Sequence, residues 1–510
     1  MPRTAARPAR TRAKQSAVRI RCYRQGLGDC FLLSFPTKKG KPCHVLIDCG
    51  VWPKGKPNAE RMREIAADVI RETGGSLTAS GAVKTRGTID VLVATHEHWD
   101  HLSGFTQARD LFKDGLDVRH IWLAWTEDES DELAKDLRKQ KQKTENAVRH
   151  LHARLAGRRG LSAAGTAALR QLESALGFLG VDDPAKPGSI DEAMDFVRTG
   201  FAGATPHFHL PGARLELPGV EGVRVYVLGP PHDRAKIRKS TPSTAHSEVY
   251  ELAFGQSLED SLLAALGAGD SAQARFRDPA EIGKPFEHTH RQDLQTVRAD
   301  KTTVSAKLLA AHYDAPTEAW RKIDDDWLFA GGSIALRLDA ATNNTSLVLA
   351  FELPDGRVLL FPGDAQVGNW LSWHDATNSW AGRGAGGAPI TARDLLARTA
   401  FYKVGHHGSH NATLRELGLE LMTRPDLIAV VPVSHQMALD NGWDRIPLPS
   451  LVERLREKTK GRLWFTVEYE GDGKHYTNPD IDQLAKLKPA ERVALKKAVT
   501  PDPLWIDFKL

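Results

Sequence analysis

The sequence predicts an α/β protein that carries two helical insertions. Three observations predict it: β-rich runs at the start, a continuous β-branched apolar run at residues 89–95, and a charged segment with helical spacing at residues 127–201. With 510 residues, 41% of them hydrophobic and 26% charged, the chain can bury a large core and has an ordinary globular composition. No apolar run approaches the roughly 20 residues of a spanning helix, so we expect no transmembrane segment and no membrane partner.

Residues 1–17 are predicted to form a basic, disordered arm. They carry no acidic residue, and their basic residues contribute to the net charge of the whole chain, which is +5. Two interpretations stay open: a solubilising tail, or an arm that contacts nucleic acid. The Ala- and Arg-rich composition would also suit an organelle transit peptide. Because the segment lacks the apolar centre of a secretory signal, we expect a cytoplasmic protein.

All the cysteines lie in the first tenth of the chain. Their spacings match no paired C-x-x-C metal site, and a chain of this length needs no disulfide framework to fold. We therefore expect small buried residues on neighbouring strands at Cys22, Cys30, Cys43 and Cys49.

The first part of the predicted core covers residues 18–126. Residues 18–49 alternate extended runs with turns, which is typical of antiparallel hairpins that end at Asp48. A helical pattern follows at residues 58–72. The apolar run 89–95 is typical of a strand covered on both faces, and it ends directly before a group of histidines.

The middle of the chain is predicted to hold both insertions. Residues 127–205 form the helical insertion, whose apolar residues are expected to pack on the core or form a cap. Core strands return at residues 206–232. The second insertion, residues 233–326, mixes helical and polar loop patterns and contains no motif that indicates a function.

The second part of the core is predicted at residues 327–470. A Pro-Asp-Gly-Arg turn at 354–357 joins strands 345–353 and 358–361, and Gly363-Asp364 follows this hairpin. A further strand at 401–404 ends in the run Gly405-His406-His407-Gly408. Strand and helix patterns then alternate at 428–433, 449–458 and 463–469. Residues 471–510 form a C-terminal extension without an assigned role.

The run His96-Glu97-His98-Trp99-Asp100-His101 places three imidazoles and a carboxylate directly after the buried strand. Imidazole and carboxylate are ligands that borderline divalent cations prefer. Alternating residues at a strand end point the same way, so His96 and His98 can bind one ion. Asp100 and His101, on the following turn, can then reach a second ion.

The run matches H-x-H-x-D-H, and in this the sequence resembles the metallo-β-lactamase superfamily. Asp48, Asp364 and the pair His406-His407 resemble further motifs of that family. The segments 344–349, 363–365 and 403–409 are similar to the β-lactamase-like domain of the ComEC/Rec2 competence proteins. The resemblance implies an αββα sandwich, in which two mixed β-sheets lie between helical layers.

The resemblance also implies a ligand set for two divalent metal ions, Zn or Mn, with a single ion as the alternative. His96 and His98 would bind the first ion, Asp364 would bridge, and Asp100, His101 and His406 would bind the second. A third histidine for the first ion is not evident, and His207, His209, His232 or none of them remain open. Asp48 would orient ligands, and Asp100 and His407 are the candidate catalytic residues.

These residues predict a hydrolase that uses a metal-activated hydroxide. The expected substrate is a phosphodiester of DNA or RNA, because of the competence-type resemblance and the basic arm. An acyl hydrolase acting on a lactone, lactam or thioester is the alternative enzyme, and a non-catalytic metal-binding interaction module is the third interpretation. The sequence carries no G-x-S-x-G elbow or P-loop in a suitable context, and it leaves the oligomeric state open.

Overall fold

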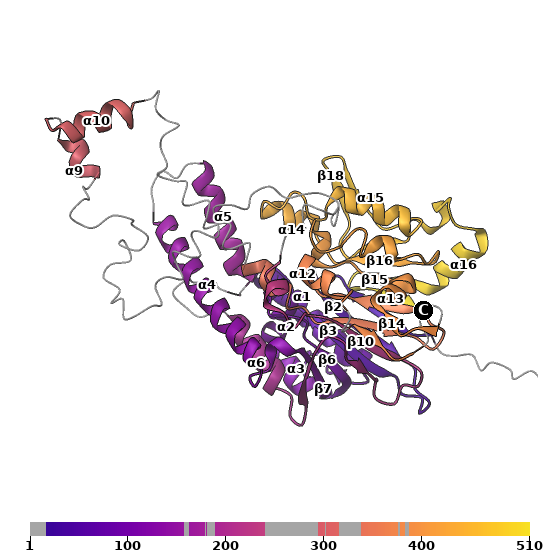
Figure 1. Ribbon diagram of the computed structural model, residues 1–510. Helices are drawn as coiled ribbons and strands as arrows, with labels where there is room; N and C mark the ends of the chain where they lie inside the picture. Colours follow the sequence, from indigo (N-terminus) through magenta and orange to yellow (C-terminus); the bar gives the residue numbers. More distant parts are fainter. Residues whose placement is uncertain are drawn as a thin grey trace, which may run out of the picture.

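Two β-sheets face each other and helices cover their outer faces, as the computed structural model shows (Figure 1). This arrangement confirms the predicted α/β class and the αββα sandwich. The structure describes residues 17–157, 163–178, 180, 189–239, 294–300, 302–315, 338–375, 378–382 and 387–510. The predicted basic arm, apart from residue 17, and most of the second insertion lie outside these ranges.

The first sheet has the strand order β20-β21-β1-β2-β3-β6-β7-β8. Strands β1 to β3 pair antiparallel, as the hairpin pattern predicts, whereas β3, β6, β7 and β8 run parallel. The apolar run of β6 is buried on both faces. The strands are β1 (Arg19–Tyr23), β2 (Cys30–Phe35), β3 (Cys43–Cys49), β6 (Gly87–Val93), β7 (Leu116–Ala124), β8 (Thr205–His209), β20 (Val499–Pro501) and β21 (Trp505–Lys509).

The second sheet has the order β17-β16-β15-β12-β11-β10-β9. The predicted hairpin pairs β11 with β12 antiparallel, and β12, β15, β16 and β17 then run parallel. Apolar side chains of both sheets form the core between them. The strands are β9 (Arg214–Leu215), β10 (Arg224–Gly229), β11 (Val348–Glu352), β12 (Val358–Phe361), β15 (Thr399–Lys403), β16 (Ile428–Val431) and β17 (Leu463–Phe465).

Each outer face has its own apolar layer of helices. On the first sheet these are α1 (Lys56–Glu72), α2 (Trp99–Gln107), α3 (Arg109–Gly115) and α6 (Ser189–Thr199). On the second sheet they are α12 (Val367–Ser372), α13 (Ala392–Ala397) and α15 (Pro449–Lys458). Because α6 belongs to the predicted helical insertion, part of that insertion packs on the core.

The rest of the helical insertion contains α4 (Glu132–Ala156) and α5 (Ala163–Phe178), which lie side by side and project from the sandwich (Figure 1). No helix among the described residues is both long enough and apolar enough to cross a membrane. The remaining elements are β4 (Ser76–Leu77), β5 (Val83–Thr85), η1 (Trp125–Glu127), α7 (Arg234–Ile237), α9 (Leu294–Ala299), α10 (Val304–His312), β13 (Ser379–Trp380), β14 (Ile390–Thr391), η7 (His406–Gly408), η8 (Leu419–Leu421), α14 (His435–Asp440), β18 (Tyr469–Gly471), β19 (Lys474–Tyr476), η9 (Ile481–Gln483) and α16 (Pro489–Ala498).

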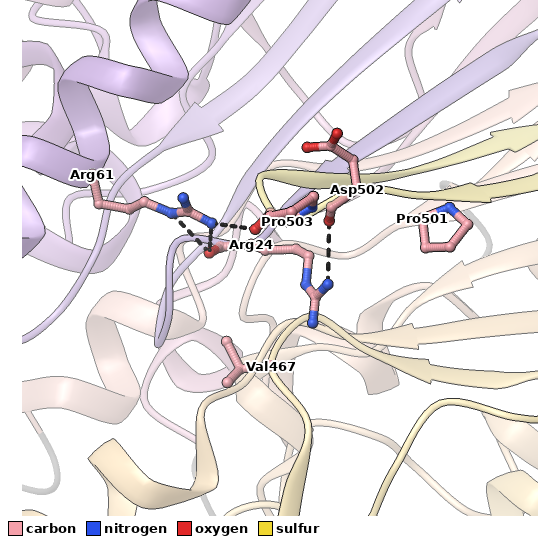
Figure 2. Close-up of a pocket in the computed structure, with 6 residues that line it drawn as sticks. All are labelled: Arg24, Arg61, Val467, Pro501, Asp502 and Pro503. Atoms are coloured by element: carbon pink, nitrogen blue, oxygen red, sulfur yellow. Dashed lines mark hydrogen bonds between the residues drawn. The ribbon is translucent and has the colours of Figure 1, made fainter.

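The C-terminal segment returns to the first sheet and pairs β21 with β1. Arg21 of β1 donates to both carboxylate oxygens of Asp507, at 2.8 and 2.9 Å. Arg61 of α1 donates to the backbone oxygens of Arg24 and Pro503, in a surface pocket that also includes Asp502 (Figure 2). Residues 499–509 therefore complete an edge of the core.

All the cysteines are buried free thiols on β1, β2 and β3. Cys30 and Cys49 are partners in the β2–β3 register. This confirms the interpretation of these residues as small core side chains.

Candidate metal centre

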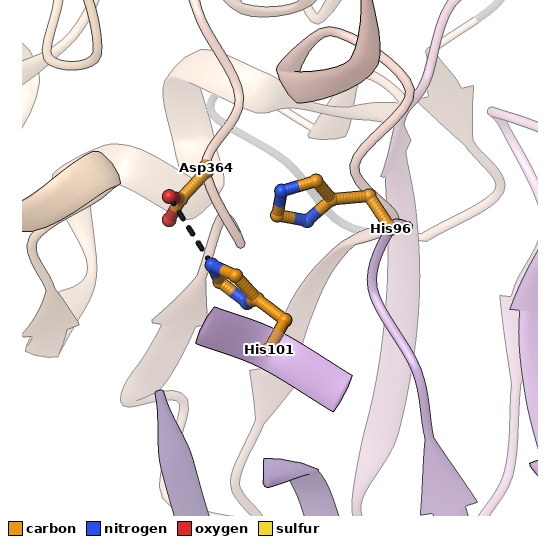
Figure 3. Close-up of side chains that lie close together, drawn as sticks. All are labelled: His96, His101 and Asp364. Atoms are coloured by element: carbon orange, nitrogen blue, oxygen red, sulfur yellow. Dashed lines mark ion pairs between the residues drawn. The ribbon is translucent and has the colours of Figure 1, made fainter. Parts of the chain in front are cut away.

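The ends of four buried strands bring the predicted site residues together. Asp48 lies at the end of β3, and the histidine run follows β6, which is parallel to β3. Asp364 follows β12 in the second sheet, and His407 follows the parallel strand β15. Because the carboxyl ends of parallel strands lie at the same edge of a sheet, each sheet contributes two of these segments. Figure 3 shows His96, His101 and Asp364 side by side.

Two glycines allow the histidine loop to pack against the first hairpin. A Cβ atom at Gly50 would lie 2.5 Å from the backbone oxygen of Asp100, and one at Gly28 would lie 2.6 Å from it. The backbone N–H of Asp29 donates to that same oxygen at 3.0 Å. Only residues without a side chain fit this close backbone approach, so both glycines help to fix the position of Asp100.

Two groups of possible ligand atoms share one carboxylate. His96, His101 and Asp364 form one group, and Asp100, Asp364 and His407 form the other, with all ligand atoms of a group within 4.8 Å of one another. His101 Nε2 lies 3.2 Å from Asp364 Oδ2 and 3.5 Å from Asp100 Oδ2. Asp364 is therefore placed to serve both groups.

The ring nitrogens that face away from these groups are held by hydrogen bonds. His101 Nδ1 donates to Asp48 Oδ2 at 2.8 Å, and His407 Nδ1 donates to the backbone oxygen of Pro432 at 2.7 Å. His96 Nδ1 lies 3.1 Å from the hydroxyl of Thr95, which itself donates to Asp48. These bonds select the tautomer that leaves each Nε2 available as a ligand.

His98 uses the other nitrogen. Its Nδ1 lies 3.1 Å from His96 Nε2, so these two nitrogens converge. In a third group, Asp29, Asp48 and His101, the possible ligand atoms also lie within 4.8 Å of one another. Because His101 Nδ1 already donates to Asp48 there, this group supports the histidine from outside.

A buried lysine holds the outer oxygen of Asp364. Lys403 Nζ contacts Asp364 Oδ1 at 2.9 Å, Asp29 Oδ2 at 2.5 Å and the backbone oxygen of Gly363 at 2.7 Å. The backbone N–H of His406 donates to the same Asp364 Oδ1 at 2.9 Å. Only Oδ2 of Asp364 therefore remains for a ligand.

The protonation of the site follows from burial and from this charge arrangement. Burial lowers the pKa of His98 to about 3 and holds the pKa of His96 well below its usual range. Burial also acts to lower the pKa of His101, but Asp364, Asp100, Asp29 and Asp48 together raise it well above its ordinary value. Burial would raise the pKa of Asp364, whereas Lys403 and His101 hold it well below the usual range.

Another carboxyl group faces the site from the helical residues 338–343. Burial, together with the charges of Asp100 and Asp364, raises the pKa of Asp339 to about 8. Nearby cations would offset the repulsion between these carboxylates.

The residues present fit divalent cations. Several buried polar atoms of the site have no hydrogen-bond partner, among them Asp100 Oδ1, His101 Nε2 and Asp364 Oδ2. A buried polar atom without a hydrogen bond costs free energy, and a bound cation would satisfy the lone pairs of these atoms. Imidazole nitrogens and carboxylate oxygens are donors that Zn²⁺ and Mn²⁺ accept.

The structure brings together His96, His98, Asp100, His101 and Asp364, which the sequence analysis assigned as ligands. The last histidine motif differs from the assignment. His407, predicted as catalytic, joins Asp100 and Asp364 in a ligand group, and its Nε2 lies 2.8 Å from Asp100 Oδ2. His406, predicted as a ligand, instead places its Nδ1 2.8 Å from the Ser409 hydroxyl. The geometry therefore favours His407 over His406 as the ligand.

The three histidines considered for the first ion lie in other surroundings. His207 pairs with His120 of the neighbouring strand at 3.4 Å, and the ring of His209 lies against Trp122. His232 Nε2 bonds Asp131 at 2.9 Å. None of them joins a ligand group among the described residues. The structure thus favours the interpretation that none of them serves the first ion.

Sequence reasoning missed Lys403 and Asp339. Lys403 lies in the segment 403–409 that carries the competence-type resemblance, so its position next to His406 and His407 was an available signal. Asp339 has no motif around it, and only the tertiary structure brings it to the site.

Residues 26–213 match the family model described as the metallo-beta-lactamase superfamily. The match includes the histidine run and ends before Asp364 and His407, which the fold brings to the same place. No curated protein matches the chain significantly.

Proposed function

From the match of residues 26–213 to the metallo-beta-lactamase superfamily model, we propose that the chain is a metal-dependent hydrolase of phosphodiesters in DNA or RNA. One observation carries the proposal: Asp364 belongs to both ligand groups, so its free oxygen can hold two cations close together. Paired cations suit in-line displacement at phosphorus because they can stabilise both the attacking and the leaving oxygen.

The ions would be held by residues of both sheets. His96 and His98 would serve one ion, Asp100 and His407 the other, and His101 and Asp364 lie between these pairs. Bound divalent cations would lower the pKa of water and polarise the group under attack. The buried Oδ1 of Asp100 has no partner, so it can accept a proton from the attacking water and return it to the leaving oxygen.

Two further features support a polyanionic substrate. The segments 344–349, 363–365 and 403–409 resemble a DNA-processing domain of competence proteins. The basic residues of the predicted N-terminal arm would attract phosphates, and binding through them would weaken as the salt concentration rises.

The test compares substrate classes on one protein. Chelator-treated protein is assayed with added Mn²⁺ or Zn²⁺ on bis(p-nitrophenyl) phosphate, on labelled DNA and RNA oligonucleotides, and on ester, lactone and lactam chromogens. We expect metal-dependent cleavage of the phosphodiesters. We expect Asp364→Asn to lower the rate of this cleavage at least ~100-fold, since a lost catalytic charge costs several kcal/mol. Asp355→Asn, at an exposed turn in the preceding hairpin, is the matched control.

Two results would contradict the proposal. Turnover of acyl substrates alone would identify an acyl hydrolase. Metal binding without turnover of any substrate, together with full biological activity of His98→Ala and Asp364→Ala, would identify a non-catalytic module.

A further inference from the structure

We propose that Asp339 is the positioning residue of His98, forming a carboxylate–histidine–metal arrangement that keeps His98 Nδ1 free for the first ion. This inference rests on the proposed metal-dependent function. It assigns a role to a residue that no sequence motif marks, at the side of the site where a third histidine was sought.

The His98 ring is oriented with Nδ1 toward His96. Nδ1 lies 3.1 Å from His96 Nε2, which is the spacing expected of two nitrogens that bind one ion at about 2.0–2.1 Å each. The other nitrogen, Nε2, lies 3.8 Å from Asp339 Oδ1. Asp339 thus faces the side of the ring opposite to the ligand nitrogen.

The other site histidines show how such a ring is held. His96, His101 and His407 each have a hydrogen-bond partner for the nitrogen that does not face the ligand groups: Thr95, Asp48 and the oxygen of Pro432. His98 needs the same support, because a proton on Nδ1 would remove its ligand lone pair. Asp339 is the carboxylate that the structure places next to its Nε2.

The carboxylate of Asp339 has one oxygen available to the His98 ring. Its Oδ1 is buried and has no hydrogen-bond partner, whereas its Oδ2 accepts from Asn343 Nδ2 at 3.1 Å. A proton on His98 Nε2 would satisfy the unpaired oxygen after a shift of less than 1 Å to an ordinary hydrogen-bond length. Phe178 packs on the His98 ring with centroids 5.5 Å apart, which limits how the ring can turn.

The geometry separates this role from direct ligation. Asp339 Oδ1 faces Nε2 of the His98 ring, whereas the nitrogen that converges with His96 Nε2 is Nδ1. Its carboxylate therefore acts on the ion through His98.

The experiment measures metal affinity and tautomer state, without using activity. Zn²⁺ binding to the full chain is measured by competition with a chromogenic chelator for the wild type, Asp339→Asn, Asp339→Glu and the exposed control Asp355→Asn. Nitrogen-15 spectra of histidine-labelled, Zn²⁺-loaded protein report which His98 nitrogen carries the proton. We expect a proton on Nε2 in the wild type. Asp339→Asn should lose about 10- to 100-fold in affinity at one ion, Asp339→Glu should recover part of it, and stoichiometry at saturating Zn²⁺ should stay unchanged.

The outcomes distinguish the two proposals. A wild type that binds no Zn²⁺ or Mn²⁺ would remove the proposed function and this inference with it. A wild type that binds metal, with equal affinity in Asp339→Asn, would overturn the inference alone. Loss of one whole ion in Asp339→Asn at saturating Zn²⁺ would also overturn it, because that result would make Asp339 a ligand. Urea unfolding of each metal-free variant identifies any variant that fails to fold.

Discussion

Replacing Lys403 by methionine should destabilise the metal-free protein strongly. Lys403 is 1% exposed and contacts two carboxylates that are themselves 2% and 1% exposed, Asp29 and Asp364. Methionine is similar in length but has no charge. The substitution therefore leaves two buried carboxylates without their shared cation and the oxygen of Gly363 without its donor.

The magnitude follows from the burial of this group. Removing one partner of a buried ion pair costs about 3–5 kcal/mol, because a buried charge is left uncompensated. We expect a loss in this range for Lys403→Met. The double variant Lys403→Met/Asp29→Asn removes one of the stranded charges and should recover about 0.5–3 kcal/mol, the usual range of coupling between contacting residues.

Urea unfolding in the presence of a chelator measures these free energies, and an unchanged m-value shows that the same transition is compared. Lys38→Met is the control, since Lys38 is 76% exposed and a surface substitution changes stability by about 0.5 kcal/mol or less. The reasoning is refuted if Lys403→Met lies within about 1 kcal/mol of the wild type. It is equally refuted if the double variant is no more stable than the single one.

Three further predictions test the surroundings of the site. Gly50→Ala should lower the free energy of unfolding by about 1–3 kcal/mol and weaken Zn²⁺ binding, because its Cβ would lie 2.5 Å from the backbone oxygen of Asp100. Urea unfolding and chelator competition compare it with Gly55→Ala, whose Cβ would have only one neighbour, at 3.9 Å, and equal values for the two variants would contradict the prediction. Asp48→Asn should lower Zn²⁺ affinity about 10- to 100-fold by releasing the His101 tautomer, and unchanged affinity in the chelator assay would oppose that role. Without metal, the stabilising contribution of Asp339 should be lost as the pH rises from about 4 to 8, because burial and the charges of Asp100 and Asp364 raise its pKa to about 8 in the folded state. Urea unfolding at several pH values should show the wild type losing stability relative to Asp339→Asn across that window, and a difference between the two that does not change with pH would argue against it.

The elements that the sequence predicted share a strong local signal. The buried run before His96 is continuously apolar, and the turn at 354–357 marks its hairpin, so β6, β11 and β12 were predictable. The helix predicted at 449–458 has the bounds of α15. Strand β7 was not predicted, because its charged and apolar residues do not alternate over its whole length. The C-terminal strands were missed because their pairing with β1 joins residues almost 500 positions apart.

The site residues also fall into those with a local sequence signal and those placed only by the tertiary structure. Residues within the run 96–101 were assigned from their residue types and spacing and from the family resemblance, and the structure brings them together. The choice between His406 and His407 depends on the backbone conformation of two adjacent residues that both have positive φ, which no spacing rule specifies. Asp339 and the contact of Lys403 with Asp29 arise from packing between distant segments, so neither could be read from local pattern.

We propose that both sheets contribute ligands to one pair of divalent cations. A crystal structure of protein loaded with Zn²⁺ or Mn²⁺, with anomalous difference maps at the metal edge, tests it most directly. We expect two peaks about 3.5–4 Å apart, one beside His96 and His98, one beside Asp100 and His407, with Asp364 between them. Fully loaded crystals without an anomalous peak within ligand distance of Asp364 would contradict it.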